Sequence, residues 1–168
     1  MILAIDIGNT NIVLGCMDGK KRYFTERLST NKTKMEMEYA IDIRMIMDIN
    51  GVSPEEIEGA IISSVVPPLT KIIQEALYKI IKKEALVVGP GIKNGMNILM
   101  DHPAQIGRDL IAVAVGGIAE YKLPLAIFDL GTATTLCVVD EKKNYIGGMI
   151  MPGIKTSLNA LAENASQL

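Results

Sequence analysis

An internal repeat constrains this chain more than any other feature of its sequence. Residues 4–21 resemble residues 126–143, and each copy contains an Asp-x-Gly bend, which begins at Asp6 in the first copy and at Asp129 in the second. The spacing from that aspartate to the next aspartate of the pattern is 12 residues in the first copy and 11 in the second. A repeated supersecondary unit predicts two related domains that face one another. The alternative is a chance similarity of two ordinary hairpins.

The segments around the two copies predict alternating strands and helices. Residues 2–28 predict an antiparallel meander of three strands, because Asp18-Gly19 between apolar runs is typical of a hairpin turn. Helical periodicity predicts helices at residues 33–49, where Thr33 and Glu36 form a capping box, at 69–80 and at 104–121. A three-stranded meander followed by alternating helix and strand indicates an α/β ribonuclease-H-like fold of the actin-like ATPase type, with mixed sheets.

The repeat also predicts the domain organisation. Residues 1–121 are expected to form a first ribonuclease-H-like domain with an inter-domain helix, and residues 122–168 the start of a second domain with three strands and one helix. The second copy lacks the further strands of the first, which would leave an open sheet edge. We therefore expect a chain truncated at its C-terminus, or one that a partner subunit completes.

Charge and composition exclude several classes of function. The 168 residues carry 17 basic and 19 acidic side chains, a net charge of -2, with no block of like charge, so nucleic-acid binding is not expected. No apolar run is long enough to cross a bilayer, and the N-terminus lacks the basic region of a signal peptide. Cys16 and Cys137 stand alone in apolar sequence and are interpreted as buried reduced thiols. These features predict a cytoplasmic protein without membrane association.

Each Asp-x-Gly bend combines backbone freedom with hydrogen-bond donors, as a phosphate-binding loop requires. Glycine lets the backbone approach a phosphate, and the neighbouring amides and hydroxyls can donate to it. The carboxylates of Asp6 and Asp129 would repel phosphate unless a cation lies between the two groups. The alternative is that both bends are merely Asx-type hairpin turns. The predicted phosphate-binding residues are Asp6, Gly8, Asn9, Thr10, Asn11, Gly131, Thr132 and Thr134.

Asp109 is the third carboxylate of interest. In helical register it shares a side with Ile106 and Val113, so it is expected to project near apolar surface, where a carboxylate suits general-base catalysis on a hydroxyl group. The alternative is a residue at the border of the core that pairs with Arg108 or a nearby lysine. The single histidine, His102, is interpreted as a turn residue, because no metal-ligand spacing surrounds it.

Five motifs, in order along the whole chain, resemble those of the type III pantothenate kinases. They include the two Asp-x-Gly bends and an apolar Ser-Ser segment, and all five occur at residues 6–11, 61–68, 88–95, 129–135 and 147–153. The resemblance implies ATP-dependent phosphorylation of pantothenate, the first step of coenzyme A synthesis, by a cytoplasmic homodimer. It also implies dependence on Mg²⁺ and on a monovalent cation, K⁺ or NH₄⁺.

The same resemblance implies roles for individual residues. Asp6 would orient the metal-bound phosphate, Asp129 would support the monovalent cation, and Asp109 would take the proton from the pantothenate hydroxyl. The substrate pocket would include Met100, Gly107, Arg108 and Asp109.

The departures from the family pattern lie in that pocket. The family usually has Gly-x-Asp-Arg where this chain has Gly107-Arg108-Asp109-Leu110, and Arg108 cannot simply replace the missing arginine, because it stands two helical positions away from it. Met100 replaces the family's usual tyrosine, and family members are longer. The alternatives are therefore a non-catalytic or regulatory relative of the same fold, an inactive truncated fragment, or a nucleotide-binding ATPase without an acceptor.

Overall fold

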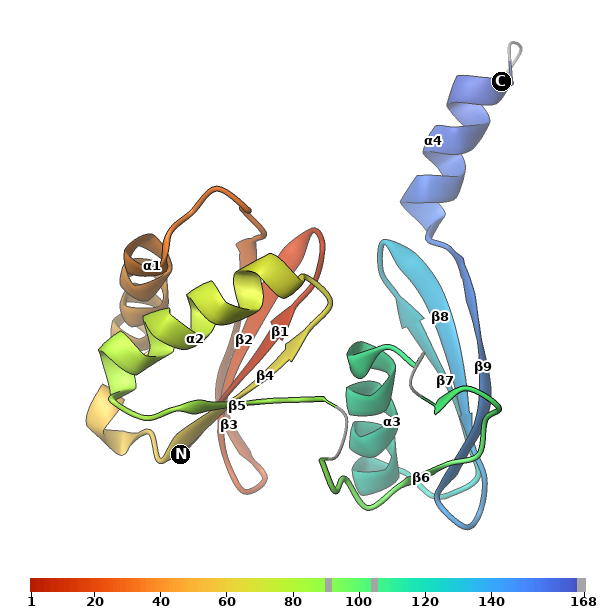
Figure 1. The fold of residues 1–168 in the computed structure, drawn as a ribbon, viewed down its shortest axis with the longest axis horizontal. Helices are drawn as coiled ribbons and strands as arrows, with labels where there is room; N and C mark the ends of the chain where they lie inside the picture. The colour runs from red at the N-terminus through yellow and green to blue at the C-terminus, as the bar shows by residue number, and fades with distance from the viewer. Residues whose placement is uncertain (90–91, 104–105, 166–168) are drawn as a thin grey trace. The chain divides into compact units, whose positions relative to one another are not determined.

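The structure, a computed structural model, describes residues 1–89, 92–103 and 106–165. The chain divides into two compact units, Met1–Gly89 and Pro90–Leu168 (Figure 1). This division places the helix at residues 108–120 with the second unit. The domain limits that the repeat predicts, 1–121 and 122–168, stay a prediction.

The first unit is built on a five-stranded mixed sheet in the order β3-β2-β1-β4-β5. The central strand β1 pairs antiparallel with β2 and parallel with β4, which pairs parallel with β5. The predicted meander and α/β class are confirmed. The elements are β1 (Ile2–Ile7), β2 (Asn11–Asp18), β3 (Lys21–Ser29), α1 (Glu36–Ile49), a 3₁₀ turn (Pro54–Glu56), β4 (Gly59–Ser64), α2 (Pro67–Ile81) and β5 (Ala85–Val87).

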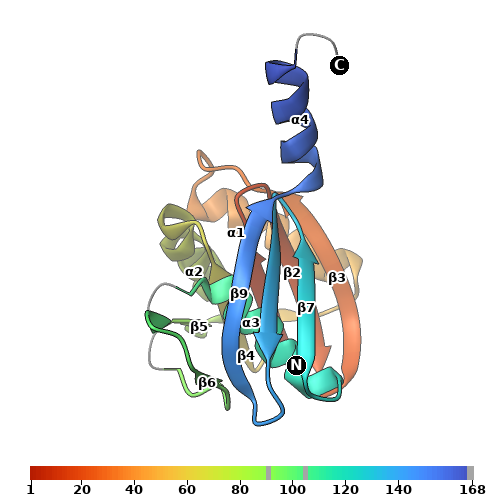
Figure 2. The ribbon, with the colours of Figure 1, turned by 90° about the vertical axis from the view of Figure 1, so that its right-hand side faces the viewer.

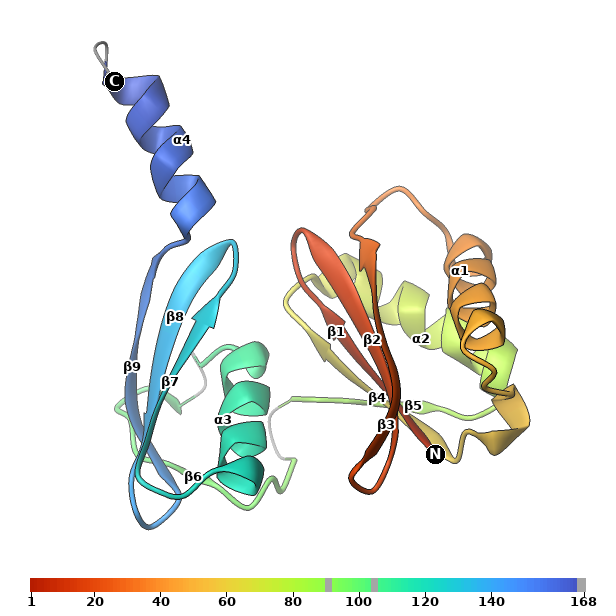
Figure 3. The same cartoon turned by 180° about the vertical axis from the view of Figure 1, so that it is seen from behind.

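Helices α1 and α2 cover one face of this sheet, as Figures 1 and 3 show from opposite sides. Alternate side chains of β1, Leu3, Ile5 and Ile7, point to that face and are buried, whereas Asp6 points to the other face. Tyr39 of α1 is among the fully buried residues that pack against them. Because side chains alternate between the two faces of a strand, Asp6 points away from the helices, whereas its neighbours Ile5 and Ile7 pack beneath them.

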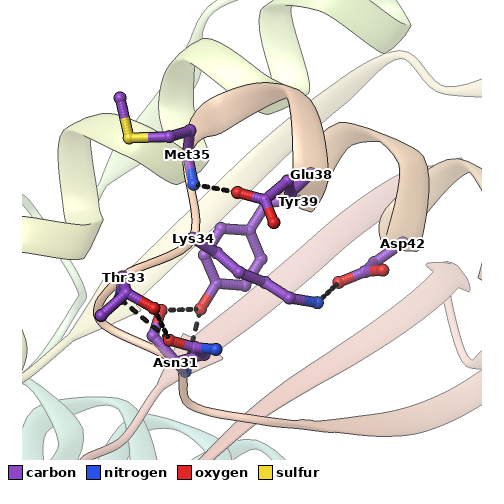
Figure 4. A network of polar contacts seen from close by, with 7 residues as sticks. All are labelled: Asn31, Thr33, Lys34, Met35, Glu38, Tyr39 and Asp42. Atoms are coloured by element: carbon purple, nitrogen blue, oxygen red, sulfur yellow. Dashed lines mark hydrogen bonds and ion pairs between the residues drawn. The ribbon is translucent and has the colours of Figure 1, made fainter.

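A polar network fixes the chain between β3 and α1 (Figure 4). The Tyr39 hydroxyl donates to the carbonyl of Asn31 at 2.7 Å and accepts from its N–H at 3.1 Å. The predicted capping box is wrong: Thr33 Oγ1 donates to the Asn31 side chain at 2.7 Å, and the helix begins at Glu36. Glu38 instead accepts from the Met35 N–H at 2.9 Å. The network anchors the end of β3 to the core.

The second unit carries a four-stranded sheet in the order β6-β9-β8-β7, with α3 packed against β7 and β8 (Figure 2). Leu125 and Ile127 of β7 contact a small core centred on Ala114, Cys137, Val139 and Tyr145. The predicted second meander is confirmed. The elements are β6 (Asn97–Ile98), α3 (Arg108–Glu120), β7 (Leu125–Leu130), β8 (Ala133–Val139), β9 (Asn144–Pro152) and α4 (Ile154–Asn164).

Two helices of the second unit differ in how well the sequence predicts them. Helix α3 begins at Arg108, after Gly107, and not at residue 104; residues 104 and 105 lie outside the described part of the chain. Helix α4 is present as predicted, but its apolar residues Ile154, Leu158 and Leu161 are 66%, 60% and 52% exposed. It extends away from the sheet at the end of β9 (Figure 2).

Candidate functional site

The first Asp-x-Gly bend joins β1 to β2 and is held by hydrogen bonds from two directions. The Gly8 N–H donates to the Asn11 carbonyl at 2.9 Å and closes the turn. Thr30, just after β3, donates its hydroxyl to the Gly8 carbonyl at 2.7 Å and its N–H to the Thr10 carbonyl at 2.9 Å. Asn9 and Thr10 remain exposed. The bend therefore has a fixed backbone and accessible donors, as a phosphate site requires.

Asp6 precedes this bend and is exposed, on the face of the sheet opposite α1 and α2. It lies near the carboxyl end of β1, next to the parallel strand β4. In open α/β sheets ligands bind at this end of the parallel strands. An exposed carboxylate here fits a hydrated Mg²⁺, which proteins typically bind through one or two carboxylates together with substrate phosphates.

The second Asp-x-Gly bend joins β7 to β8 and is one residue shorter. The Gly131 N–H donates to the Ala133 carbonyl at 3.0 Å, so three residues form the bend where the first copy has four. This difference accounts for the spacing of 11 instead of 12 in the repeat. Thr132 is exposed, and Thr134 pairs with Leu130 at the first position of the hairpin.

The start of α4 supports this second bend. The Gly153 N–H donates to the Thr132 carbonyl at 3.0 Å, and Thr156 Oγ1 donates to the same carbonyl at 2.9 Å. A Cβ atom on Gly153 would collide with the carbonyl oxygens of Gly131 and Thr132, so only glycine permits this contact. Gly153 provides no side-chain cap for α4. Amide donors and the positive end of the helix dipole therefore lie beside the bend, where they favour an anion.

Asp109 occupies the first turn of α3 and is half-buried. Its carboxylate lies so close to Gly107 that a side chain at Gly107 would collide with it. Arg108 is half-buried, and Met100 is 38% exposed. The missing side chain at Gly107 thus leaves room for the Asp109 carboxylate, whereas binding of a substrate by these residues stays a prediction.

The charges of Asp109 and Asp129 act on two buried neighbours in the second unit, Tyr145 and Cys137. Burial raises the pKa of Tyr145, and the nearby Cys137 and Asp109 raise it further. Burial also raises the pKa of Cys137, and the charge of Asp129 adds to the effect. Asp129 points to the same face of β7 as Ile127, which packs against α3. Asp109 and Asp129 therefore lie on the same side of the second sheet, whereas Asp6 belongs to the first unit.

Other features of the described residues lie outside these bends. A groove of about 760 Å³ between α1 and α2 contains none of the predicted site residues. Across residues 1–89, 92–103 and 106–165, no helix combines the length and apolarity that crossing a membrane requires. The same residues contain no group of three or more His, Cys, Asp or Glu side chains arranged to hold a metal ion. Both cysteines are buried and unpaired, as predicted.

Comparison with known proteins identifies the family of this chain. The sequence model of the family described as type III pantothenate kinase matches residues 2–168. The chain belongs to the type III pantothenate kinase family. Proteins named type III pantothenate kinase from Exiguobacterium sp. and Brevibacillus brevis are 46% and 45% identical over all 168 residues. The chain spans 66% of the length of each of these relatives.

Solved structures confirm the fold class of this family member. A reductive activator for a corrinoid, iron-sulfur protein superposes with a TM-score of 0.52 at 16% identity, over 83% of this chain and 29% of that one. A Ppx/GppA phosphatase from Aquifex aeolicus superposes with a TM-score of 0.50 at 13% identity, over 99% of this chain and 56% of that one. The predicted actin-like ATPase fold is thereby confirmed.

The structure also identifies residues near the bends that sequence reasoning did not single out. Thr30, Gly153 and Thr156 hold the two bends, and Ser63 pairs with Asp6 in the register of β1 and β4. Thr30 and Thr156 lie 22 and 24 residues from the carbonyls that they bind, so no local pattern could reveal them. Ser63 and Gly153 lie within the family motifs at residues 61–68 and 147–153, so these motifs were the sequence feature that could have identified them.

Proposed function

We propose that the protein to which this chain belongs transfers the γ-phosphoryl group of ATP to pantothenate and forms 4'-phosphopantothenate. The observation that carries this proposal is the pair of Asp-x-Gly bends, each closed by a glycine N–H and held by a threonine hydroxyl, in a chain of the type III pantothenate kinase family. Phosphoryl transfer depends mainly on positioning and electrostatic stabilisation, which fixed backbone donors provide.

Each of the two bends would bind nucleotide phosphates. Gly8, Asn9, Thr10 and Asn11 in the first bend, and Gly131, Thr132 and Thr134 in the second, would contribute hydrogen bonds to phosphate oxygens. Asp6 would hold hydrated Mg²⁺, and Asp129 would support K⁺ or NH₄⁺. A bound Mg²⁺ supplies positive charge that stabilises the developing negative charge on the phosphates.

Asp109 would act as the general base. Its carboxylate would accept the proton of the pantothenate hydroxyl as the hydroxyl oxygen bonds to the γ-phosphorus and the bond from that phosphorus to the bridging oxygen of ADP breaks. The bare backbone of Gly107 leaves the space that the Asp109 carboxylate occupies. Arg108 and Met100 would also contact the substrate.

We extend the proposal to the setting of the protein. A homodimer in the cytoplasm, without nucleic-acid partners, is what the family resemblance and the near-neutral charge of -2 support. The oligomeric state can be measured directly by light scattering on the purified chain.

Pantothenate-dependent turnover tests the proposal. The protein is incubated with ATP, Mg²⁺, K⁺ and pantothenate, and ADP release is followed with and without pantothenate. We expect stimulated turnover that falls by about 10²-fold or more in Asp109→Asn, because general-base catalysis typically contributes that much. Glu120→Gln, at the exposed opposite end of α3, is the matched control and should turn over like the wild type.

One observation favours a second candidate function, a non-catalytic relative of the same fold. Leu110, which stands where the family usually has an arginine, is only 8% exposed and belongs to the hydrophobic interior. A folded chain that binds ATP without any turnover would support this candidate. Turnover that is indifferent to pantothenate would instead indicate an ATPase without an acceptor.

A further inference from the structure

We infer that Ser63 is a ligand-positioning residue of the Asp6 site, and that its hydroxyl binds an oxygen atom of the Mg²⁺–nucleotide complex. That oxygen belongs to a metal-bound water or to a phosphate. The inference rests on the proposed nucleotide binding and adds a residue to that site. It starts from the position of Ser63 in the sheet, its burial and its hydrogen bonding.

The strand register places Ser63 beside Asp6. The two residues pair directly in the parallel ladder of β1 and β4. Neighbouring strands lie about 4.8 Å apart, and paired residues project to the same face of a sheet. Ile7 and Ser64, one residue further along each strand, pair with each other and point to the opposite face, which α1 and α2 cover. Ser63 and Asp6 therefore share the face of the sheet opposite α1 and α2, at the carboxyl end of β1 and β4.

The hydroxyl of Ser63 lacks the partner that a buried polar group normally has. Ser63 is only 8% exposed, and its Oγ makes no hydrogen bond to any residue that the structure describes. Most buried side-chain polar atoms have a partner, and an unsatisfied one costs stability. The loss of stability from the unsatisfied hydroxyl is offset if a bound ligand forms a hydrogen bond with it, and the neighbouring Asp6 carboxylate is where we propose that a ligand binds.

The adjacent serine shows what a structural role looks like in the same segment. Ser64 Oγ accepts from the Val66 N–H at 3.1 Å and from Thr70 Oγ1 at 2.8 Å. These bonds fix the start of α2. Ser64 therefore provides a matched control: it is buried to a similar extent, one residue away in sequence, and satisfied within the fold.

Paired measurements of stability and binding test the inference in Ser63→Ala and Ser64→Ala. We expect Ser63→Ala to leave the melting temperature of the ligand-free protein unchanged or to raise it, because it removes an unsatisfied buried hydroxyl. The same variant should bind Mg²⁺–ATP about tenfold more weakly, as measured by calorimetric titration. Ser64→Ala should show the reverse pattern, with a lower melting temperature and binding within about twofold of the wild type.

Repeating the titration with ATP in EDTA distinguishes the two oxygen sources. A binding defect that disappears without Mg²⁺ supports the metal-bound water, and one that persists supports a phosphate oxygen. Wild-type binding by Ser63→Ala would overturn the inference and leave the proposed function intact, and so would a variant that loses stability together with binding. A wild-type protein that binds no ATP would overturn the proposed function, and the inference with it.

Discussion

The two Asp-x-Gly bends are built alike but lie in different surroundings. The first follows the central strand of its sheet, β1, which has paired neighbours on both sides. The second follows β7, an edge strand with β8 as its one neighbour in the described sheet, and the start of α4 supports it instead of a parallel strand. The repeat therefore specifies the bend, whereas the tertiary neighbours specify what each bend can do. A buried hydroxyl lies beside the first, and helix-terminal amides lie beside the second.

The carboxylates of the two bends should differ in their importance for catalysis, and this is the largest effect that we expect. Asp6→Asn should reduce turnover about a hundredfold or more, because it removes the charge that would hold Mg²⁺. Asp129→Asn should reduce turnover less and should raise the K⁺ concentration needed for half-maximal activity. ADP release measured across K⁺ concentrations checks both. If both substitutions reduced turnover equally, and if the K⁺ concentration did not change either reduction, the different roles assigned to Asp6 and Asp129 would be contradicted.

The glycines that support the bends should differ in their tolerance of a side chain. Gly153→Ala should destabilise the protein by about 1–3 kcal/mol, because its Cβ would overlap two backbone carbonyls that cannot move independently. Gly8→Ala should cost less, because its Cβ would lie 3.0 Å from a single carbonyl, that of Asn11. Urea unfolding of both variants measures the difference, and Gly116→Ala, which meets no atom within 4 Å, is the control.

The threonines that hold the bends allow a finer comparison. Thr30→Val should cost about 1 kcal/mol, because a partly buried hydrogen bond to the Gly8 carbonyl is lost. Thr156→Val should cost less, since its bond to the Thr132 carbonyl is exposed and water can replace it. Urea midpoints of the two variants test the order, which a larger loss for Thr156→Val would reverse.

The smallest expected effect concerns the hairpin turns that end each copy. In the first copy, Gly19 supplies a positive φ of 55°; in the second, Lys143 has φ 64° and the Asp140 carboxylate organises the turn. Hydrogen bonds from Asn144, together with one from the Lys142 N–H, hold the pKa of Asp140 below its usual value of 3.8. A lowered pKa means that this contribution to stability is present above about pH 4 and is lost as the pH falls through the lowered pKa.

Acid unfolding of Asp140→Asn measures that contribution. The variant should be less stable than the wild type at pH 6, and the two should converge as the pH falls below 3.8 and through the lowered pKa of Asp140. Asp18→Asn, at the matching position of the first copy, is the control. A stability difference that stays constant as the pH falls from 6 through the acid unfolding range would show that the Asp140 charge does not matter.

The sequence predicted most of the fold because its signals were local. Alternation and the Asp18-Gly19 turn are sufficient for the first meander, and the repeat extends the prediction to the second. The capping box at Thr33 was wrong, because Thr33 binds the Asn31 side chain instead of the helix. The start of α3 was also predicted too early, because apolar periodicity continues across Gly107.

The candidate site was predictable only in part, for a physical reason. The bend residues and Asp109 stand in recognisable motifs, but their supports come from distant segments. Ser63 and Ser64 look equivalent in the sequence, and only the pairing of β1 with β4 shows that Ser63 is the one that lies beside Asp6. Register is a property of two strands together, so it could not be read from either strand alone.

Hydrogen exchange of the backbone amides, measured with and without Mg²⁺–ATP, tests most directly whether each of the two bends binds nucleotide. We expect ATP to slow exchange in peptides that cover residues 6–11 and in those that cover 129–135, because phosphate contacts order both bends. The hairpin turns at residues 18–21 and 140–144 serve as internal controls and should not change. Protection confined to one bend, or absent from both while ATP is bound, would contradict the phosphate-binding role of both bends.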